Sequence, residues 1–288
     1  MRKTLILGSH GMLGQALFEV FNNKKYETIA WDREDLDITD NRKVTQVITT
    51  IKPKIIINAA GYTDVDGAET DQELAMKVNA QAVGYLAKVS RLVDALFIHI
   101  STDYVFDGKN KKGYKETDFS DKSLNVYGES KRLGEEALIK EAENKLKYYL
   151  IRTSWLFGSG GKNFVKTMIG TAYQRKDLSV VDDQQGKPTY AKDLASTIKY
   201  IIESDLESGI YHFTNEPKLT WHKFAKIIFD IKKEIDPSFP VPKVFPVSSE
   251  EFPRPAKRPE YSVLLNTKLP KGRNIKTALR DYLTDYKP

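Results

Sequence analysis

Residues 4–14 read Thr-Leu-Ile-Leu-Gly-Ser-His-Gly-Met-Leu-Gly, a short apolar run followed at once by three glycines spaced three residues apart. The apolar run predicts a buried strand, and the apolar spacing after the turn predicts a helix. Glycine at these places permits a tight turn, close approach of the backbone to a pyrophosphate, and close packing of helix on strand. The helix N-terminus also offers free N–H groups to phosphates. The stretch therefore predicts a dinucleotide-binding turn, with contacts from Gly8, His10, Gly11, Met12, Leu13 and Gly14.

The rest of the first half continues this alternation of β-rich and helical runs. Strands are expected at 4–7, 26–31, 54–58, 96–100 and 148–153, and helices at 12–21, 44–51, 72–93 and 127–142. Strands that alternate with helices of this length form βαβ units, whose strands pair in parallel. The expected fold class is α/β, a doubly wound parallel sheet of the Rossmann type with a smaller C-terminal substrate-binding domain.

The second half of the chain is less regular. Helices are expected from Asn163 onward, over 189–204 and near 275–286, with a strand over 209–214. A chain of 288 residues exceeds the usual size of one domain. We expect residues 1–155 to form the dinucleotide-binding domain, with 189–215 returning to it. Residues 156–188 and 216–288 are expected to form the substrate-binding domain.

The end of the second predicted strand bears on the choice of cofactor. A carboxylate there, Asp32, accepts hydrogen bonds from the adenosine ribose hydroxyls and favours NADH. Arg33 follows it and could pair with a 2′-phosphate, which favours NADPH. The cofactor is therefore NADPH or NADH with the preference open, and a solvated loop position for Asp32 is the alternative. Asp37 and Ile38 are expected in the same binding region.

Tyr127 and Lys131 form the one Tyr-x-x-x-Lys pattern in the chain. The pattern alone arises readily by chance, but here it opens the helix expected after the fourth strand. Residues four apart share a helix face, so the phenol and the ammonium can point at one pocket. A free tyrosine titrates at about pH 10, and a nearby ammonium stabilises the phenolate of a general acid/base. The pair is therefore a candidate catalytic site.

The fourth strand is followed by Ser101-Thr102-Asp103-Tyr104. Ligands of doubly wound sheets bind at the carboxyl ends of the strands. We therefore expect Thr102 to donate a hydrogen bond to a substrate carbonyl oxygen while Tyr127 protonates that oxygen. The alternative is that Thr102 only caps a turn.

Together, the glycine turn, the run Ser-Thr-Asp-Tyr-Val-Phe at 101–106 and the Tyr127–Lys131 pair resemble the extended short-chain dehydrogenase/reductases. Within that superfamily the chain resembles the dTDP-4-dehydrorhamnose reductase family most. The supporting segments lie in family order along nearly the whole chain, at 58–69, 152–158, 163–168, 183–189 and 256–262.

This resemblance implies an enzyme that reduces the C4 keto group of dTDP-4-dehydro-L-rhamnose to give dTDP-L-rhamnose, with hydride from NAD(P)H. It implies Thr102, Tyr127 and Lys131 as catalytic residues, and a cofactor lining that includes Ala59, Ala60 and Thr63. The second domain would then bind the sugar nucleotide. The implied substrate contacts are Thr102, Asp103, Tyr104, Trp155, Asn163, Gln184 and Arg258. Structural alternatives remain open, with Trp155 in the core, Asn163 as a helix N-cap and Arg258 in a surface ion pair.

Three positions depart from the family pattern. Some members dimerise through a magnesium ion held by glutamates, where this chain has Ala16 and Lys192. Neither side chain binds magnesium, so no metal is expected. We expect a monomer or a weak homodimer. Ser123 stands where a proline is usual, which should change only how the loop enters the catalytic helix.

Composition restricts the partners and the location. The net charge of +6 is mixed along the chain without a basic block, which argues against a nucleic-acid partner. No run approaches the roughly 20 apolar residues of a membrane helix, so no membrane association is expected. There is no cysteine, hence no disulfide framework. We expect a cytoplasmic protein.

Several alternatives share this fold. One is a reductase or epimerase of another nucleotide-linked keto-sugar, and an epimerase would keep NAD tightly bound on purification. Dehydratases follow the threonine with Asp-Glu, whereas Tyr104 follows Asp103 here. Another alternative is a non-catalytic regulatory subunit, since the regulatory subunit of methionine adenosyltransferase is similar to this family.

Overall fold

The apolar runs of the first half form one parallel sheet. In the computed structural model, which describes residues 1–286, the strand order is β10-β5-β4-β3-β1-β2. All five neighbouring pairs are parallel. The strands are β1 (Arg2–Leu7), β2 (Tyr26–Trp31), β3 (Ile55–Asn58), β4 (Leu96–Thr102), β5 (Tyr148–Thr153) and β10 (Gly209–His212). The predicted α/β fold class is confirmed.

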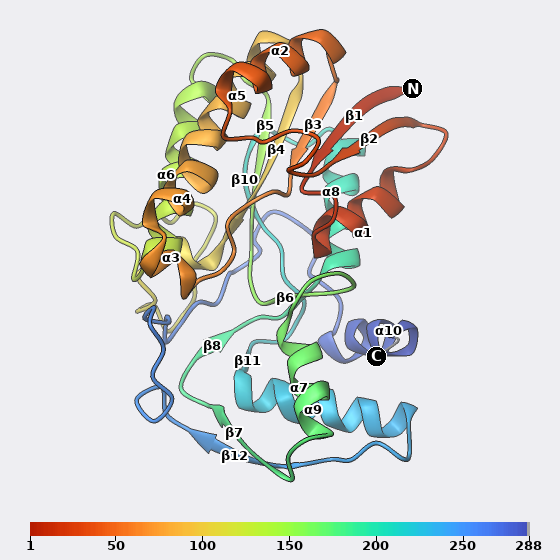
Figure 1. Cartoon of the computed structure of the whole chain (residues 1–288), viewed down its shortest axis with the longest axis vertical. Coiled ribbons are helices and arrows are strands. Elements are labelled where there is room, and N and C mark those ends of the chain that lie inside the picture. Colours follow the sequence, from red (N-terminus) through yellow and green to blue (C-terminus); the bar gives the residue numbers. More distant parts are fainter. Residues whose placement is uncertain (287–288) are drawn as a thin grey trace.

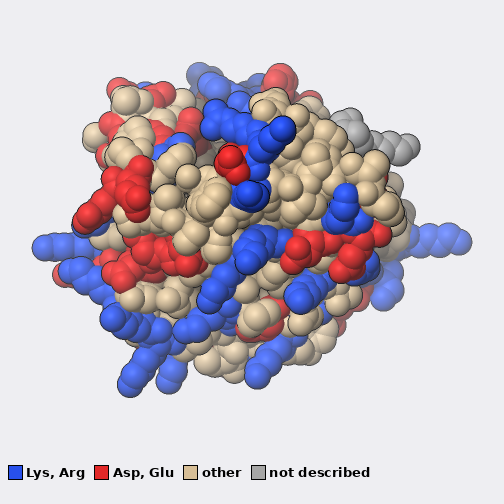
Figure 2. Space-filling view, turned by 90° about the horizontal axis from the view of Figure 1, so that it is seen from below, with Lys and Arg blue, Asp and Glu red and all other residues tan. Residues whose placement is uncertain are grey.

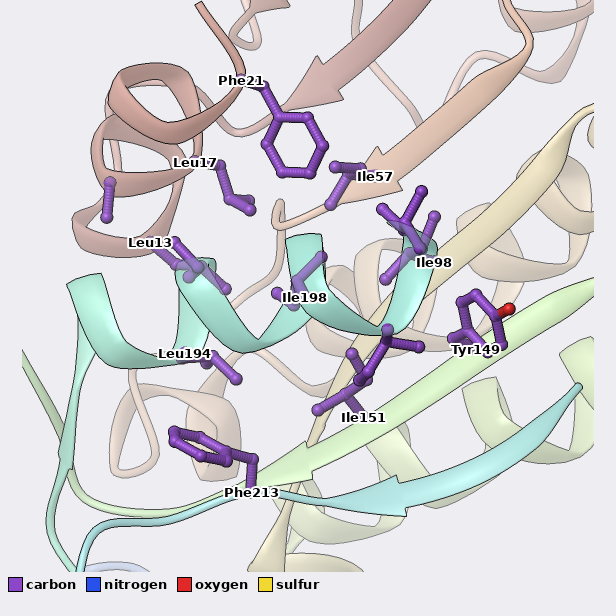
Figure 3. Close-up of a cluster of buried hydrophobic side chains, with 14 of the residues drawn as sticks. Leu13, Leu17, Phe21, Ile57, Ile98, Tyr149, Ile151, Leu194, Ile198 and Phe213 are labelled. Carbon is purple, nitrogen blue, oxygen red and sulfur yellow. The ribbon is translucent and has the colours of Figure 1, made fainter. Parts of the chain in front are cut away.

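Helices cover both faces of the sheet (Figure 1). One face carries α1 (Met12–Phe21) and α8 (Ala191–Glu203), and the other carries α2 (Asn41–Ile51), α5 (Ala82–Leu92) and α6 (Val126–Ala142). In Figure 3, Leu13 and Leu17 of α1 and Leu194 and Ile198 of α8 gather with strand residues such as Ile98. The other face has a core of its own, built from apolar residues of α2, α5 and α6. Burial on both faces explains the near-continuous apolar character of the strands.

The helix expected over 72–93 is divided. It consists of α4 (Gln72–Met76), a π-helical turn η1 (Lys77–Gln81) and α5, preceded by the short α3 (Gly67–Thr70). The π turn lies against α6, where Gly134 allows close approach: a Cβ there would lie 2.1 Å from the main-chain oxygen of Asn79. Turns of this kind often mark functional sites.

The remaining elements pack below the sheet around a third apolar cluster (Figure 1). They are β6 (Leu156–Phe157), α7 (Phe164–Ala172), β7 (Asp177–Val181), β8 (Gln185–Gly186), β9 (Thr189–Tyr190), β11 (Leu219–Thr220), α9 (Trp221–Ile235), β12 (Lys243–Val247) and α10 (Ile275–Asp285). Three two-stranded pairs, β7 with β12, β8 with β11 and β6 with β9, organise this part. The sequence analysis did not predict α9.

The chain returns to the sheet through α8 and β10, and then leaves it again for α9. This path supports the proposed division, in which residues 1–155 and 189–215 form the dinucleotide-binding domain. Residues 156–188 and 216–288 remain the proposed substrate-binding domain, of which the structure describes the part up to residue 286. The carboxyl ends of β1, β3, β4 and β5 point toward this second part (Figure 1).

Charges are mixed on the surface. On the face seen in Figure 2, Lys and Arg side chains are interspersed with Asp and Glu side chains. Among residues 1–286, no helix combines the length and the apolar character needed to cross a membrane.

Candidate active site

The glycine turn between β1 and α1 is a cradle that only glycine can form. Gly8 has a φ of +80°, and a Cβ there would lie 2.6 Å from the main-chain nitrogen of Ala60. A Cβ at Gly14 would lie 2.0 Å from the main-chain oxygen of Gly8. Gly11 is the N-cap of α1 and carries no capping side chain. Bare N–H groups at a helix N-terminus fit the phosphates of a dinucleotide.

The end of β2 is bound to this turn through Asp32. Its carboxylate accepts hydrogen bonds from the main-chain nitrogens of His10 and Arg33, both at 2.8 Å. The Arg33 side chain is exposed, and its Nε lies 3.7 Å from a carboxylate oxygen of Asp37. A carboxylate and an exposed guanidinium therefore follow one another at the end of β2, and the predicted choice between NADH and NADPH stays open.

The other predicted cofactor contacts lie on the segments that follow β1, β2 and β3. Ala59 and Ala60 directly follow β3, and Ala60 packs on Gly8. Thr63 is exposed in the loop that follows. Met12 and Leu13 open α1, Leu13 in the core and Met12 partly buried. The Asp37 carboxylate accepts hydrogen bonds from Thr39, and Ile38 is buried. Their roles toward the cofactor remain predictions.

Helix α6, which carries Tyr127 and Lys131, begins directly after its capping residue, Asn125. The Asn125 side chain caps it by accepting from the main-chain nitrogen of Gly128 at 2.8 Å. Gly128 allows the helix to touch the chain after β4, because a Cβ there would lie 2.2 Å from the main-chain oxygen of Tyr104. The rings of Tyr104 and Tyr127 consequently meet edge to face, with centroids 5.5 Å apart. Tyr127 is thereby placed at the carboxyl end of β4.

The lysine of the pair lies one turn further into α6 and is buried. Lys131 Nζ donates a hydrogen bond to the main-chain oxygen of Ile100 at 2.6 Å and lies near Gly61. Burial lowers the pKa of Lys131 to about 8, although Glu135 acts in the opposite direction. Burial also raises the pKa of Tyr127 to about 12, and the neighbouring Thr102 hydroxyl opposes that increase. The structure thus brings together Thr102, Tyr127 and Lys131.

Thr102 and Asp103 form a buried pair at the end of β4. The Thr102 hydroxyl donates to Asp103 Oδ1 at 3.0 Å and accepts from the main-chain nitrogen of Tyr104 at 3.2 Å. The turn-capping alternative for Thr102 is therefore realised alongside its place in the site. Asp103 Oδ2 is buried without a hydrogen-bond partner. Burial raises the pKa of Asp103 to about 7, and the neighbouring hydroxyls of Ser262 and Thr102 oppose that increase.

Asn79 is a site residue that the sequence analysis missed. This buried side chain lies in the π turn and clasps the loop after β3, accepting from Tyr62 N and donating to Tyr62 O, both at 2.9 Å. It also donates to the Ser130 hydroxyl at 3.0 Å. Asn79 therefore joins the proposed cofactor loop to the residue before Lys131. An amide inside an otherwise apolar helical pattern was the available signal.

A buried ion pair lies beneath the catalytic helix. Glu135, one turn after Lys131, accepts three hydrogen bonds from the guanidinium of Arg152 on β5, and one from the Ser101 hydroxyl. Arg152 is 1% exposed and Glu135 is 4% exposed. Removing one partner of such a pair leaves an uncompensated charge in the interior, so the pair fixes α6 against β4 and β5.

On the substrate side, Trp155 follows β5 with a φ of 47°, and its indole stacks on that of Trp221. The centroids are 3.5 Å apart and the planes differ by 9°. Gln184 joins this group, because its Oε1 accepts from Trp221 Nε1 at 3.2 Å. Trp155 and Gln184 therefore meet through Trp221, which was not foreseen, and their contact with substrate stays a prediction.

Asn163 and Arg258 are both engaged within the protein. Asn163 caps α7, accepting from Lys166 N at 3.0 Å, and its amide donates to the main-chain oxygen of Gly158. The Arg258 guanidinium donates to Asp66 Oδ1 at 2.6 Å. Both structural alternatives considered for these residues are thus realised. Their contact with substrate stays a prediction. The side-chain oxygen and nitrogen of Asn163 already make hydrogen bonds within the protein.

With this geometry established, comparisons with known proteins identify the family. The sequence model of the RmlD substrate-binding domain matches residues 1–287. A dTDP-4-dehydrorhamnose reductase of Aggregatibacter actinomycetemcomitans is 42% identical over 93% of this chain and 92% of its own. The chain belongs to the dTDP-4-dehydrorhamnose reductase family.

Other relatives extend the comparison. The crystal structure of dTDP-4-dehydrorhamnose reductase from Bacillus anthracis, in complex with NADP, is 38% identical with a TM-score of 0.92 over 99% of each chain. A dTDP-4-keto-6-deoxy-D-glucose reductase of Streptomyces niveus is 35% identical over 90% of this chain and 87% of its own. The enzymes of this family are NAD(P)H-dependent oxidoreductases, as the sequence analysis expected.

The positions that bind magnesium in some members of the family are filled differently here. Ala16 lies on the buried face of α1, within the apolar core. Lys192 Nζ lies 3.2 Å from Glu19 of α1 and 3.9 Å from Asp285 of α10. An ammonium therefore stands among these carboxylates. Elsewhere His10, Asp32 and Glu34 lie close together near the surface, an arrangement common without a metal.

Proposed function

We propose that this protein reduces the C4 keto group of dTDP-4-dehydro-L-rhamnose to give dTDP-L-rhamnose, using NADPH or NADH. The observation that carries the proposal is the meeting of Thr102, Tyr127 and Lys131 at the carboxyl end of β4, beside the glycine cradle. Family membership supports the substrate, because relatives that match most of the chain are named for it.

When bound, the reduced cofactor supplies the hydride to C4. Tyr127 supplies the proton, and its raised pKa keeps the phenol protonated at neutral pH. The new hydroxyl takes this proton, and the phenolate that remains needs a positive charge nearby. Lys131, on the same helix face, provides that charge while its hydrogen bond to Ile100 fixes its position.

Thr102 and Asp103 complete the substrate side of this step. In the proposal, the Thr102 hydroxyl turns from Asp103 Oδ1 to the keto oxygen when substrate binds, which places two donors on that oxygen. The unpartnered Asp103 Oδ2 then accepts a hydrogen bond from a sugar hydroxyl. Trp155, Gln184 and Arg258 border the nucleotide end of the pocket, as the family resemblance implies.

The proposal includes a cytoplasmic location, where NAD(P)H is supplied. It also includes action as a monomer or weak homodimer without a metal, since Ala16 and Lys192 stand at the positions of the magnesium ligands.

The test is oxidation of NADPH and of NADH with dTDP-4-dehydro-β-L-rhamnose, generated in situ by the upstream dehydratase and epimerase. Turnover that requires the epimerase and yields dTDP-L-rhamnose would establish the substrate. Turnover without the epimerase would favour direct reduction of dTDP-4-keto-6-deoxy-D-glucose, the activity for which the Streptomyces niveus relative is named. No oxidation by folded protein would overturn the proposal.

Tyr127→Phe tests the role of the phenol. Loss of general acid catalysis should lower kcat by about 10²–10⁴-fold. Tyr200→Phe is the matched control, because Tyr200 is exposed on α8. A Tyr127→Phe enzyme that keeps most of its kcat would contradict the mechanism.

A further inference from the structure

The substrate side of the site contains a tryptophan stack that joins two parts of the fold. Trp155 lies two residues beyond Thr153, which is the register partner of Thr102. Trp221 is the first residue of α9, and the cluster of apolar residues around it lies below the sheet. The stack therefore connects the catalytic strand ends to the proposed substrate-binding domain.

The backbone of Trp155 needs support from its neighbours. Its φ of 47° lies in the left-handed region, which is unfavourable for a bulky residue. The indole of Trp221 lies against the indole of Trp155. The backbone of Gly186 also contacts the Trp155 indole so closely that a Cβ at Gly186 would lie 2.5 Å from Trp155 Cε2. Gly186 pairs with Leu219, two residues before Trp221. One short antiparallel pair thus supplies both contacts.

The Trp221 ring is itself held in place. Its Nε1 donates to Gln184 Oε1 at 3.2 Å, and Gln184 Nε2 donates to the Ser249 hydroxyl at 2.9 Å. Ser249 in turn donates to Asp183 at 2.6 Å. The other flank packs on Phe164, with centroids 4.6 Å apart. Both tryptophans are only partly buried, so the stack keeps an accessible edge.

We infer that Trp221 is a positioning residue that holds the indole of Trp155 in the orientation that receives the sugar nucleotide. The inference rests on the proposed function, which places Trp155 in the dTDP-sugar pocket. Trp221 contacts Trp155, Gln184 and Phe164 on the substrate side. Its removal should therefore weaken binding of the sugar nucleotide and leave binding of the cofactor unchanged.

A spectroscopic test follows from the tryptophan count. The chain has three tryptophans, so Trp31→Phe leaves only the stacked pair. Two indoles in face-to-face contact couple their transitions and give circular-dichroism bands of opposite sign. We expect this band pair in the Trp31→Phe protein and its loss when Trp221→Phe is added. A band pair that persists after Trp221→Phe would overturn the stacking on which the inference depends.

The kinetic test is a double-mutant cycle in the same Trp31→Phe background. Trp221→Phe should raise the KM for the sugar nucleotide about tenfold and leave the KM for NADPH unchanged. With Trp155→Phe already present, Trp221→Phe should add no further increase, because it acts through that ring. An equal increase in both backgrounds, or an unchanged KM after loss of the band pair, would overturn the inference. Trp221→Leu, which also removes the stack, should reproduce the pattern.

The two proposals fail in different ways. Absence of turnover in the unaltered enzyme would overturn the proposed function. The affinity for dTDP, measured by calorimetry, would then decide the inference. A Trp221→Phe protein that binds dTDP as well as the unaltered protein would overturn it, and weaker binding confined to proteins that retain Trp155 would support it.

Discussion

The side-chain nitrogen of Lys131 lies 2.6 Å from the main-chain oxygen of Ile100, two residues before Thr102 on β4. This hydrogen bond ties the catalytic helix to the strand that ends in the site. It also holds an ammonium in a buried place, which is why the pKa of Lys131 falls to about 8. The charge that the proposed mechanism assigns to Lys131 is therefore close to titration in the physiological range.

The first prediction concerns the alkaline limb of the pH–rate profile. Lys131 loses its proton as pH rises through about 8, so kcat/KM for the keto-sugar should fall across this range. Lys131→Met should lower kcat by about 10²-fold or more and abolish this limb. Lys140→Met, at an exposed position on the same helix, should leave both unchanged. A limb near pH 8 that survives in Lys131→Met would assign the titration to another group.

The second prediction concerns stability and Asp103. Burial raises its pKa to about 7 in the folded protein, from an ordinary value of 3.8. Between these values the folded state binds more protons than the unfolded state, so stability should fall as pH rises from about 4 to about 7. Asp103→Asn removes this loss and should stabilise the protein more at pH 8 than at pH 5, by up to a few kcal/mol.

Denaturant unfolding of both proteins at the two pH values measures this difference. Asp35→Asn, which removes an exposed carboxyl, serves as the control for the loss of a carboxylate without burial. The same stability gain for Asp103→Asn at both pH values would contradict ionisation as the cause. Activity should fall in the same variant, because an amide cannot replace the carboxylate at Oδ2.

The third prediction contrasts two helical glycines. In a helix, alanine is ordinarily about 1 kcal/mol more favourable than glycine. Gly170→Ala in α7 should show this gain, because nothing lies within 4 Å of its added methyl group. Gly128→Ala should instead destabilise by about 2 kcal/mol or more, since its methyl group would lie 2.2 Å from the Tyr104 oxygen. Urea unfolding tests the opposite signs, and a stabilised Gly128→Ala protein would contradict the close approach.

Much of the fold follows from local sequence because its signals are local. The apolar run at 4–7 and the glycines at 8, 11 and 14 predict a strand, a turn and a helix without reference to the rest of the chain. The same reasoning was available for α9, where Phe224, Ala225, Ile228 and Phe229 recur at helical spacing. Its signal is interrupted by neighbouring irregular segments, because the second half of the chain lacks the regular alternation of strands and helices found in the first.

Other features depend on contacts between distant segments, which no local pattern reveals. β7 pairs with β12, more than 60 residues later in the chain, and both strands are short. The stack of Trp155 on Trp221 and the ion pair of Asp66 with Arg258 are of the same kind. For the stack and the ion pair, only Trp155 and Arg258 were singled out from the sequence, and neither strand of the β7–β12 pair was predicted. The choice between a capping and a binding role for Asn163 likewise depended on where Lys166 N and Gly158 lie.

The last prediction concerns the clamp between Asp66 and residues 254–258, a segment that passes close to α3 (Figure 1). The Asp66 carboxylate accepts hydrogen bonds from Arg258 Nη1 at 2.6 Å, Arg254 Nε at 3.0 Å and Ala256 N at 3.2 Å. Although burial acts in the opposite direction, these contacts lower the pKa of Asp66 to about 2. Its contribution to stability is therefore complete above about pH 4 and is lost as pH falls through about 2.

At neutral pH, Asp66→Asn should therefore cost about 1–2 kcal/mol, a figure reduced for the half-exposed Arg254. The matched control is Glu73→Gln, which breaks an exposed ion pair with Lys77 and should change the stability much less. Because the clamp also fixes Arg258 beside the site, Asp66→Asn should raise the KM for the sugar nucleotide and not that for NADPH. Equal stability losses in the two variants, with both KM values unchanged, would show that the clamp neither stabilises the fold nor shapes the pocket.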